Sequence, residues 1–161
     1  MSTSWTNERL AWDEEDIRPR CYSVNEGWWS LRSGNATGIL FGGNLRTWLT
    51  MLGTPYAILP KKAVVFVEDI TDENIGSVHR MLIQLKQSGL LETAQGLLIG
   101  RFETGSRITR EKLEVVLDRL NLKQGFPVIA NIDFGHTDPV LSLPLGHVTT
   151  VSTDPLRIAV Q

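Results

Sequence analysis

The sequence contains little of what marks a secreted, membrane-spanning or cysteine-rich protein. Its one cysteine, Cys21, excludes an internal disulfide and any zinc site built from several cysteines. No apolar run approaches the roughly 18 residues that a membrane span requires, and residues 1–9 lack the apolar core of a signal peptide. We therefore expect a cytoplasmic protein with no membrane partner.

An excess of charge of one sign is also missing. The 161 residues carry 16 basic and 18 acidic side chains, which gives a formal net charge of −2. This balance does not indicate binding to nucleic acid or to an anionic membrane surface. Apolar side chains make up 42% of the sequence and charged side chains 21%, which is typical of one globular domain.

The first 36 residues differ in character from the rest. They hold four of the five tryptophans and an acidic stretch at 13–16, and they show no helix or strand period. We predict an arm or interdomain linker over residues 1–36 and a folded domain over residues 37–161. The tryptophans of the arm need a surface that covers them.

Beyond residue 37, short apolar runs alternate with amphipathic stretches. The runs predict buried strands, and stretches with apolar residues three and four apart predict helices. Asn44 is expected to cap the first helix, and Thr71 or Asp72 the second. The expected strands are 38–43, 63–67, 95–100 and 127–132, the expected helices are 45–52, 73–88 and 110–122, and a hairpin is expected over 147–152 and 156–160. This order predicts an α/β fold with a mostly parallel central sheet and a smaller antiparallel part.

Two titratable side chains follow predicted strands. Glu68 ends the strand 63–67, and His136 lies shortly after the strand 127–132. The carboxyl ends of parallel strands meet at one edge of a sheet, where α/β proteins place their sites. A carboxylate beside an imidazole fixes its tautomer and stabilises the imidazolium, as in a nucleophile–His–acid triad. The alternative is that Glu68 is a solvated carboxylate and His136 a hydrogen-bonded turn residue.

The third member of such a triad has no evident place in this sequence. A nucleophilic serine usually occupies a strained strand-to-helix elbow, and no Gly-x-Ser-x-Gly motif is present. Ser77 lies within a predicted helix, and Ser142 lies in a loop bounded by prolines. The chain is therefore not expected to complete a triad unaided.

Three weaker signals allow a functional and a structural interpretation each. The Gly-Gly-Asn segment 42–44 could bind an anion through its backbone N–H groups or simply form a turn with a cap. Asp133, His136 and Asp138 could bind a metal ion, although their spacing is not a standard ligand spacing. The tryptophan pair at 28–29 could stack on a ligand ring or pack the arm.

The chain resembles the LD-carboxypeptidase family in a series of short motifs. These motifs occur in the same order as in the family and extend over nearly the whole chain. The resemblance is to the C-terminal half of these proteins. It is nearer to the microcin C self-immunity branch than to the murein tetrapeptide carboxypeptidases. The motifs are Trp5-Thr-Asn-Glu8, Asn25-Glu-Gly-Trp28, Gly38-Ile-Leu-Phe-Gly-Gly-Asn-Leu45, Gly53-Thr-Pro-Tyr56, Val65-Phe-Val-Glu-Asp69, Gly96-Leu-Leu-Ile-Gly-Arg-Phe102, Asp133-Phe-Gly-His-Thr-Asp-Pro139 and Leu143-Pro-Leu-Gly146.

The resemblance implies a two-domain serine peptidase with a Ser–Glu–His triad. In the family the serine and the oxyanion hole belong to an N-terminal domain. The glutamate and histidine belong to the C-terminal domain, and their motifs correspond to Glu68 and His136 here. The resemblance also implies a swivelling β/β/α-type domain, a homodimer, and activity without a metal or other cofactor. This chain would then be a C-terminal catalytic domain that is inactive without its serine-bearing partner domain.

The resemblance leaves the substrate open. Some members trim the terminal D-residue from muropeptides, whereas the immunity branch cleaves an amide between an acidic aminoacyl group and a nucleotide-like part. That branch often carries a second asparagine and a lysine where this chain has Arg46 and Asp72. We expect Asn44, Arg46 and Trp28 to contact the substrate. A hypothesis of a different class is a non-catalytic binding or dimerisation module whose Glu–His pair is unused.

Overall fold

Seven strands form one mixed sheet at the centre of the fold. A computed structural model of the chain describes residues 1–161 apart from 12, 14–17, 59 and 71–72. The strands of the sheet are β3 (Trp29–Arg32), β4 (Asn35–Asn44), β5 (Ala63–Glu68), β6 (Gly96–Gly100), β7 (Val128–Ile132), β8 (Val148–Thr153) and β9 (Leu156–Val160). Their order across the sheet is β3-β7-β6-β5-β4-β8-β9. Strands β4 to β7 are parallel and the outer three are antiparallel to their neighbours, so the predicted fold class is confirmed.

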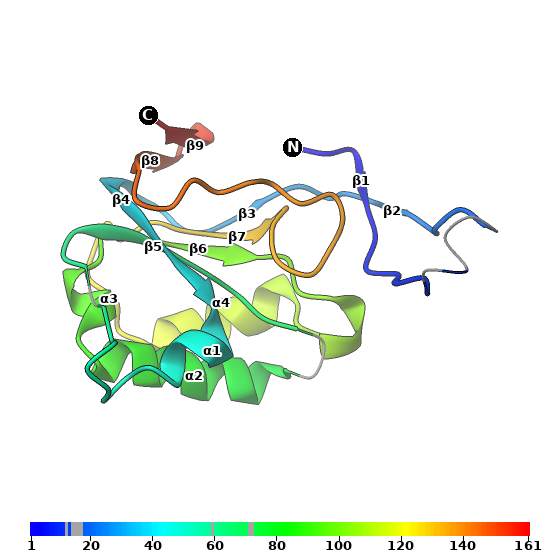
Figure 1. Cartoon of the computed structure of the whole chain (residues 1–161). Coiled ribbons are helices and arrows are strands. Elements are labelled where there is room, and N and C mark those ends of the chain that lie inside the picture. The colour runs from blue at the N-terminus through cyan, green and yellow to red at the C-terminus, as the bar shows by residue number, and fades with distance from the viewer. Residues whose placement is uncertain (12, 14–17, 59, 71–72) are drawn as a thin grey trace.

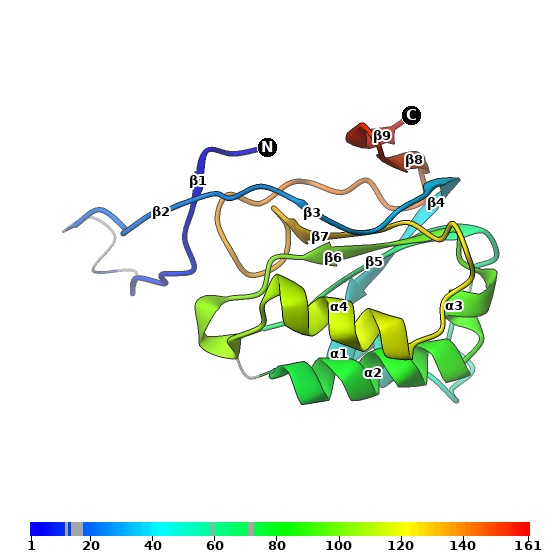
Figure 2. The same cartoon turned by 180° about the vertical axis from the view of Figure 1, so that it is seen from behind.

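The helices gather on one face of this sheet, as Figures 1 and 2 show. They are α1 (Leu45–Leu49), α2 (Ile75–Gln87), α3 (Leu90–Thr93) and α4 (Arg110–Arg119), with a 3-10 turn at Thr104–Ser106. The opposite face is covered by the β8–β9 hairpin and by the long connection after β7 (Figure 1). No helix within the described ranges is long and apolar enough to span a membrane.

The central strands are buried on both faces, which explains their continuous apolar sequences. In β5, Val65 and Val67 join the core beneath the helices, whereas Val64 and Phe66 join a second core on the other face. Successive side chains of a strand point to opposite faces, so a strand between two cores needs apolar residues at every position. The buried centre of the sheet gives its carboxyl edge a rigid support.

Helix caps are partly those expected from the sequence. The Asn44 side chain accepts the backbone N–H of Thr47, which confirms it as the cap of α1. Helix α2 begins at Ile75 rather than at residue 73, because Asn74 caps it by accepting two backbone N–H groups. The expected caps Thr71 and Asp72 lie outside the described residues.

Two other helix boundaries differ from the pattern. Helix α1 ends at Leu49, and α4 ends at Arg119 rather than at residue 122. Asn121 adopts a positive φ of 47°, which stops the helix although apolar residues continue past this point. The short helix α3, which follows Gly89, was not expected, whereas the C-terminal hairpin β8–β9 is confirmed.

The N-terminal segment is joined to the body at several points. Its short strands β1 (Ser4–Trp5) and β2 (Ser23–Val24) pair with each other. Residues 29–32, which the sequence pattern assigned to the arm, form β3 at the edge of the main sheet instead. A register irregularity between Ser30 and Arg32 and half-buried side chains weaken its strand pattern.

Candidate active site

Glu68 and His136 meet at the carboxyl edge of the parallel strands. Glu68 is the last residue of β5, and His136 lies four residues beyond the end of β7. The Nδ1 atom of His136 lies 2.6 Å from the Oε2 atom of Glu68. The Glu68 side chain is 12% exposed and the His136 side chain 35%, so the histidine is the more accessible partner. The two residues are therefore placed together on one edge, as the sequence predicts.

Two glycines make room for this contact. Strand β6 lies between β5 and β7, so Glu68 must reach across the end of β6 to meet His136. Strand β6 ends in Gly100, where a Cβ atom would lie 2.6 Å from the Phe134 carbonyl oxygen and 2.9 Å from the Glu68 Cβ. A Cβ atom on Gly135 would lie 2.9 Å from the Glu68 Oε2. These glycines thus preserve the space through which the carboxylate reaches the imidazole.

Substituting Gly135 with alanine is expected to break the contact between Glu68 and His136. The new methyl group would displace the carboxylate, and the positive φ of 108° would add backbone strain of about 1–2 kcal/mol. The low-field NMR signal of the Nδ1 proton of His136 should disappear. Gly146→Ala is the matched control, because Gly146 also has a positive φ, 81°, but no neighbouring atom within 4 Å. Loss of the signal in both variants, or in neither, would contradict this role of Gly135.

The contact leaves the second ring nitrogen of His136 available for chemistry. Within the described residues, Nδ1 makes the only hydrogen bond of this imidazole, and its partner is a carboxylate. Such a partner favours the tautomer with the proton on Nδ1, so that Nε2 is a base, and it stabilises the imidazolium after Nε2 takes a proton. The pair can therefore accept and return a proton at Nε2.

His136 lines a pocket of about 270 Å³ between the N-terminal segment and the loop after β7. Its walls are Asn7, Glu8, Arg9, Leu10, Arg20, His136 and Asp138. Thr6 and Asp138 exchange two backbone hydrogen bonds of 2.8 Å each, which fix one wall to the other. The arm thus forms one side of the space next to the imidazole.

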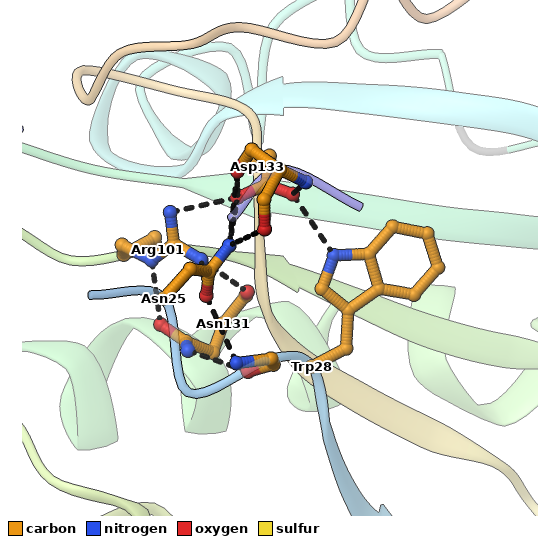
Figure 3. A network of polar contacts seen from close by, with 7 residues as sticks. Asn25, Trp28, Arg101, Asn131 and Asp133 are labelled. Carbon is orange, nitrogen blue, oxygen red and sulfur yellow. Dashed lines mark hydrogen bonds and ion pairs between the residues drawn. The ribbon is translucent and has the colours of Figure 1, made fainter. Parts of the chain in front are cut away.

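A buried polar network lies at the carboxyl ends of β6 and β7, next to the Glu68–His136 pair (Figure 3). The carboxylate of Asp133 pairs with the guanidinium of Arg101 at 2.7 Å, and both side chains are almost completely buried. Asn25 and Trp28 donate hydrogen bonds to Asp133, while Asn131 accepts one from Arg101. Burial alone would raise the pKa of Asp133, but the hydrogen bond and charge of Arg101, with the bonds from Trp28 and Ser2, hold this pKa below its usual value.

The three expected substrate contacts have internal partners. Asn44 is the register partner of Glu68 in the β4–β5 pair, which places it at the same edge, and its side chain contacts Asp69. The guanidinium of Arg46 pairs with the buried Glu73. The indole of Trp28 is partly buried and donates its N–H to Asp133. Asn44 is therefore the one of the three nearest in register to Glu68.

Two of the weaker sequence signals, the segment 42–44 and the acidic residues around His136, make structural contacts in the fold. Asn44 caps α1, a helix of five residues, so the segment 42–44 forms a strand end with a cap. Asp133 pairs with Arg101, and Asp138 pairs with Arg20. Across the described ranges, no group of three or more His, Cys, Asp or Glu side chains could hold a metal ion. The alternative of a metal site at Asp133, His136 and Asp138 therefore has no geometric support.

The sequence pattern did not indicate two parts of this site. The first is the Arg101–Asp133 ion pair. Arg101 directly follows β6 and Asp133 directly follows β7, so the sequence does place a charged residue after each of two adjacent strands, and this pattern could have indicated the pair. The pocket wall formed by residues 7–10 carried no comparable signal, because no periodic pattern links that segment to the loop at His136.

Known proteins resemble this chain in sequence and in structure. A family model described as the LD-carboxypeptidase C-terminal domain matches residues 37–151. A putative carboxypeptidase of Treponema pallidum is 34% identical over 160 residues, which cover 99% of this chain and 47% of that protein. A probable murein peptide carboxypeptidase of Bacillus subtilis is 37% identical over 126 residues, which cover 76% of this chain and 39% of that protein. The chain thus spans less than half the length of these curated relatives.

Solved structures support the same assignment. The crystal structure of an MccF-like protein from Bacillus anthracis superposes with a TM-score of 0.85 at 28% identity, over 94% of this chain and 46% of that one. The structure of MccF in complex with glutamyl sulfamoyl guanosine superposes with a TM-score of 0.81 at 27% identity, over 100% of this chain and 48% of that one. The protein therefore belongs to the LD-carboxypeptidase family, a family of peptidase-like hydrolases, and its fold is the C-terminal domain of that family.

Proposed function

We propose that this chain supplies the acid and the base of a Ser–Glu–His triad that hydrolyses an amide bond. His136 acts as the proton-transferring base and Glu68 as the acid that orients it. The observation that carries the proposal is the 2.6 Å contact between His136 Nδ1 and Glu68 Oε2 at the carboxyl edge of parallel strands. The more exposed position of His136 supports its contact with the reacting groups.

The chemistry follows from this pair and a serine hydroxyl. The serine oxygen bonds to the amide carbonyl carbon while Nε2 of His136 takes the hydroxyl proton. The carbon–nitrogen bond then breaks, and the same proton passes from Nε2 to the leaving amine. A water molecule repeats both steps on the acyl-enzyme and restores the serine. Glu68 stays ionised and stabilises the imidazolium in both halves.

The serine of this triad belongs, in our proposal, to a domain outside these 161 residues. The chain covers 47% of its relative from Treponema pallidum, and the resemblance implies that the family's serine lies in an N-terminal domain. Residues 1–36 would contain the linker to that domain, and residues 37–161 would form the C-terminal domain. The chain by itself would then be inactive.

The substrate is an amide with a small acyl or amine part. One relative carries the name of a murein peptide carboxypeptidase, and MccF was solved with glutamyl sulfamoyl guanosine. We propose a muropeptide L,D-peptide bond or an aminoacyl-nucleotide amide as the substrate. Asn44 is proposed as a substrate contact because it is the register partner of Glu68, and Trp28 and Arg46 as further contacts.

The proposal predicts that activity requires both halves. The chain alone should hydrolyse neither substrate class, and joining it to, or mixing it with, a serine-bearing N-terminal domain of the family should produce hydrolysis. Product release is measured by mass spectrometry on a muropeptide tetrapeptide and on a glutamyl sulfamoyl nucleoside. Absence of hydrolysis in a complex that forms would favour the alternative function, a non-catalytic binding or dimerisation module. A homodimer and a cytoplasmic location stay predictions alongside this function.

A further inference from the structure

We propose that the pocket beside His136 binds the negatively charged group of the leaving part of the substrate, and that Arg9 and Arg20 bind that group. The inference rests on the proposed function, because it takes His136 as the group that protonates the leaving amine. It states that the pocket holds the leaving side of the scissile bond and that its ligand is an anion. The expected ligand groups are a carboxylate or a phosphoryl group.

The position of His136 in the pocket decides which side of the substrate lies there. Nε2 must come within hydrogen-bond reach of the leaving nitrogen in order to protonate it. The part of the substrate attached to that nitrogen therefore lies against His136. The pocket of about 270 Å³ next to this imidazole has room for one small residue or one phosphoryl group.

The walls of the pocket are fixed before any ligand binds. Thr6 is hydrogen-bonded to Asp138 through both backbone groups, and the Thr104 hydroxyl donates to the side chain of Asn7. Arg9 pairs at 2.7 Å with Glu103, whose side chain is 2% exposed. A buried carboxylate thus holds the arginine at the pocket wall, and a preorganised donor of this kind costs little entropy when a ligand binds.

Two side chains of the pocket have donor groups that suit an anion. Arg9 and Arg20 both line it, and a guanidinium carries five N–H donors in a planar fork that matches carboxylate and phosphate groups. Both carboxylates of the pocket are already paired, Glu8 with Arg18 and Asp138 with Arg20. The two arginines are paired as well, Arg9 with Glu103 and Arg20 with Asp138, so the charged side chains around the pocket balance one another. The anion is therefore expected to bind through the N–H groups of the guanidinium forks and not through a net positive charge.

The proposed substrates share the required group on the correct side. A carboxypeptidase releases a residue that carries a free carboxylate, and an aminoacyl-nucleotide amide joined through phosphorus releases a part that carries a phosphoryl group. The released part of a sulfamoyl nucleoside carries neither group, so this anion contact is not expected for it. Recognition of this negative charge in the pocket would restrict cleavage to the end of a peptide or to a nucleotide-like amide. The two sources of the anion are separated by the probes that follow.

Binding to this chain can be measured without the serine-bearing domain. The NMR signals of the three histidine rings are followed during titration with D-alanine, with AMP and with D-alaninamide, which lacks the carboxylate. We expect D-alanine or AMP to shift the His136 signal and to leave those of His79 and His147 in place. A response to D-alanine alone assigns the anion as a carboxylate, and a response to AMP alone assigns it as a phosphoryl group.

Charge-removing variants test the two arginines. Arg9→Gln and Arg20→Gln should each weaken binding of the active probe about 10- to 100-fold, the usual effect of losing a charge-assisted hydrogen bond. Arg157→Gln is the matched control, because Arg157 lines a different cavity on the β8–β9 hairpin. In the assembled enzyme, Arg9→Gln should raise KM much more than it lowers kcat, and Arg9→Lys should restore part of the loss.

Several results would overturn the inference. These are no shift of His136 with either anion, an equal response to D-alaninamide, or equal weakening by Arg157→Gln. The binding measurement is independent of catalysis. If neither anion binds but His136→Ala abolishes hydrolysis, the anion site is refuted and the triad is supported. If an anion binds but His136→Ala has no effect on turnover, the triad is refuted and the binding result is unaffected.

Discussion

Replacing His136 with alanine is expected to lower kcat/KM of the assembled enzyme by about 10⁴- to 10⁶-fold. The substitution removes the group that takes the serine proton and returns it to the leaving amine. Folding should change little, because the imidazole is 35% exposed and makes its one described hydrogen bond to Glu68. Steady-state hydrolysis and thermal unfolding of the same preparation measure the two effects.

Glu68→Gln should lower kcat by roughly 10⁴-fold, since an amide keeps the shape of the carboxylate but cannot stabilise the imidazolium. The double variant should lose little more than His136→Ala alone, because the two residues act as one unit. Matched controls are His147→Ala and Glu92→Gln, both on exposed side chains away from the pair. A His136→Ala enzyme with near-normal turnover would refute the triad assignment.

The arrangement of the central sheet could be predicted because it depends on local pattern. Continuous apolar runs such as residues 63–67 occur where a strand is covered on both faces, and β5 has a core on each side. Strand β3 could not be predicted, because its half-buried residues pair with a strand roughly a hundred residues away across a register irregularity. Such pairing depends on tertiary contacts that no local period records.

The meeting of Glu68 and His136 could also be anticipated, because parallel strands deliver their ends to one edge. The precise contact could not. It requires the space that Gly100 and Gly135 leave. A glycine in a sequence can indicate that other atoms approach the backbone closely, but it does not indicate which atoms these are. Asp133 illustrates the same limit: the sequence allowed a metal ligand, and the fold gave this carboxylate a buried arginine.

That ion pair provides the largest expected effect on stability. Asp133→Asn should lower the free energy of unfolding by about 3–5 kcal/mol, because it leaves the charge of Arg101 buried without its partner. For a domain of this size the melting temperature should fall by about 6–20 °C. The double variant Arg101→Met with Asp133→Leu should be less destabilised than Asp133→Asn, since it removes both charges. Glu114→Gln, which breaks the exposed Arg110–Glu114 pair, should cost less than about 0.5 kcal/mol.

The same carboxylate predicts how stability depends on pH. Burial alone would raise the pKa of Asp133, but the hydrogen bond and charge of Arg101, together with the hydrogen bonds from Trp28 and Ser2, lower it in the fold. Its contribution is therefore complete above the usual aspartate pKa of about 3.9 and is lost as pH falls below that value through the lower pKa of the folded state. Urea unfolding from pH 7 to pH 2 should show wild type losing stability in this acid range. Asp133→Asn should lose correspondingly less, because its amide does not titrate. Parallel acid profiles for the two proteins would mean that the ionised carboxylate of Asp133, with its partners Arg101, Asn25 and Trp28, does not stabilise the fold.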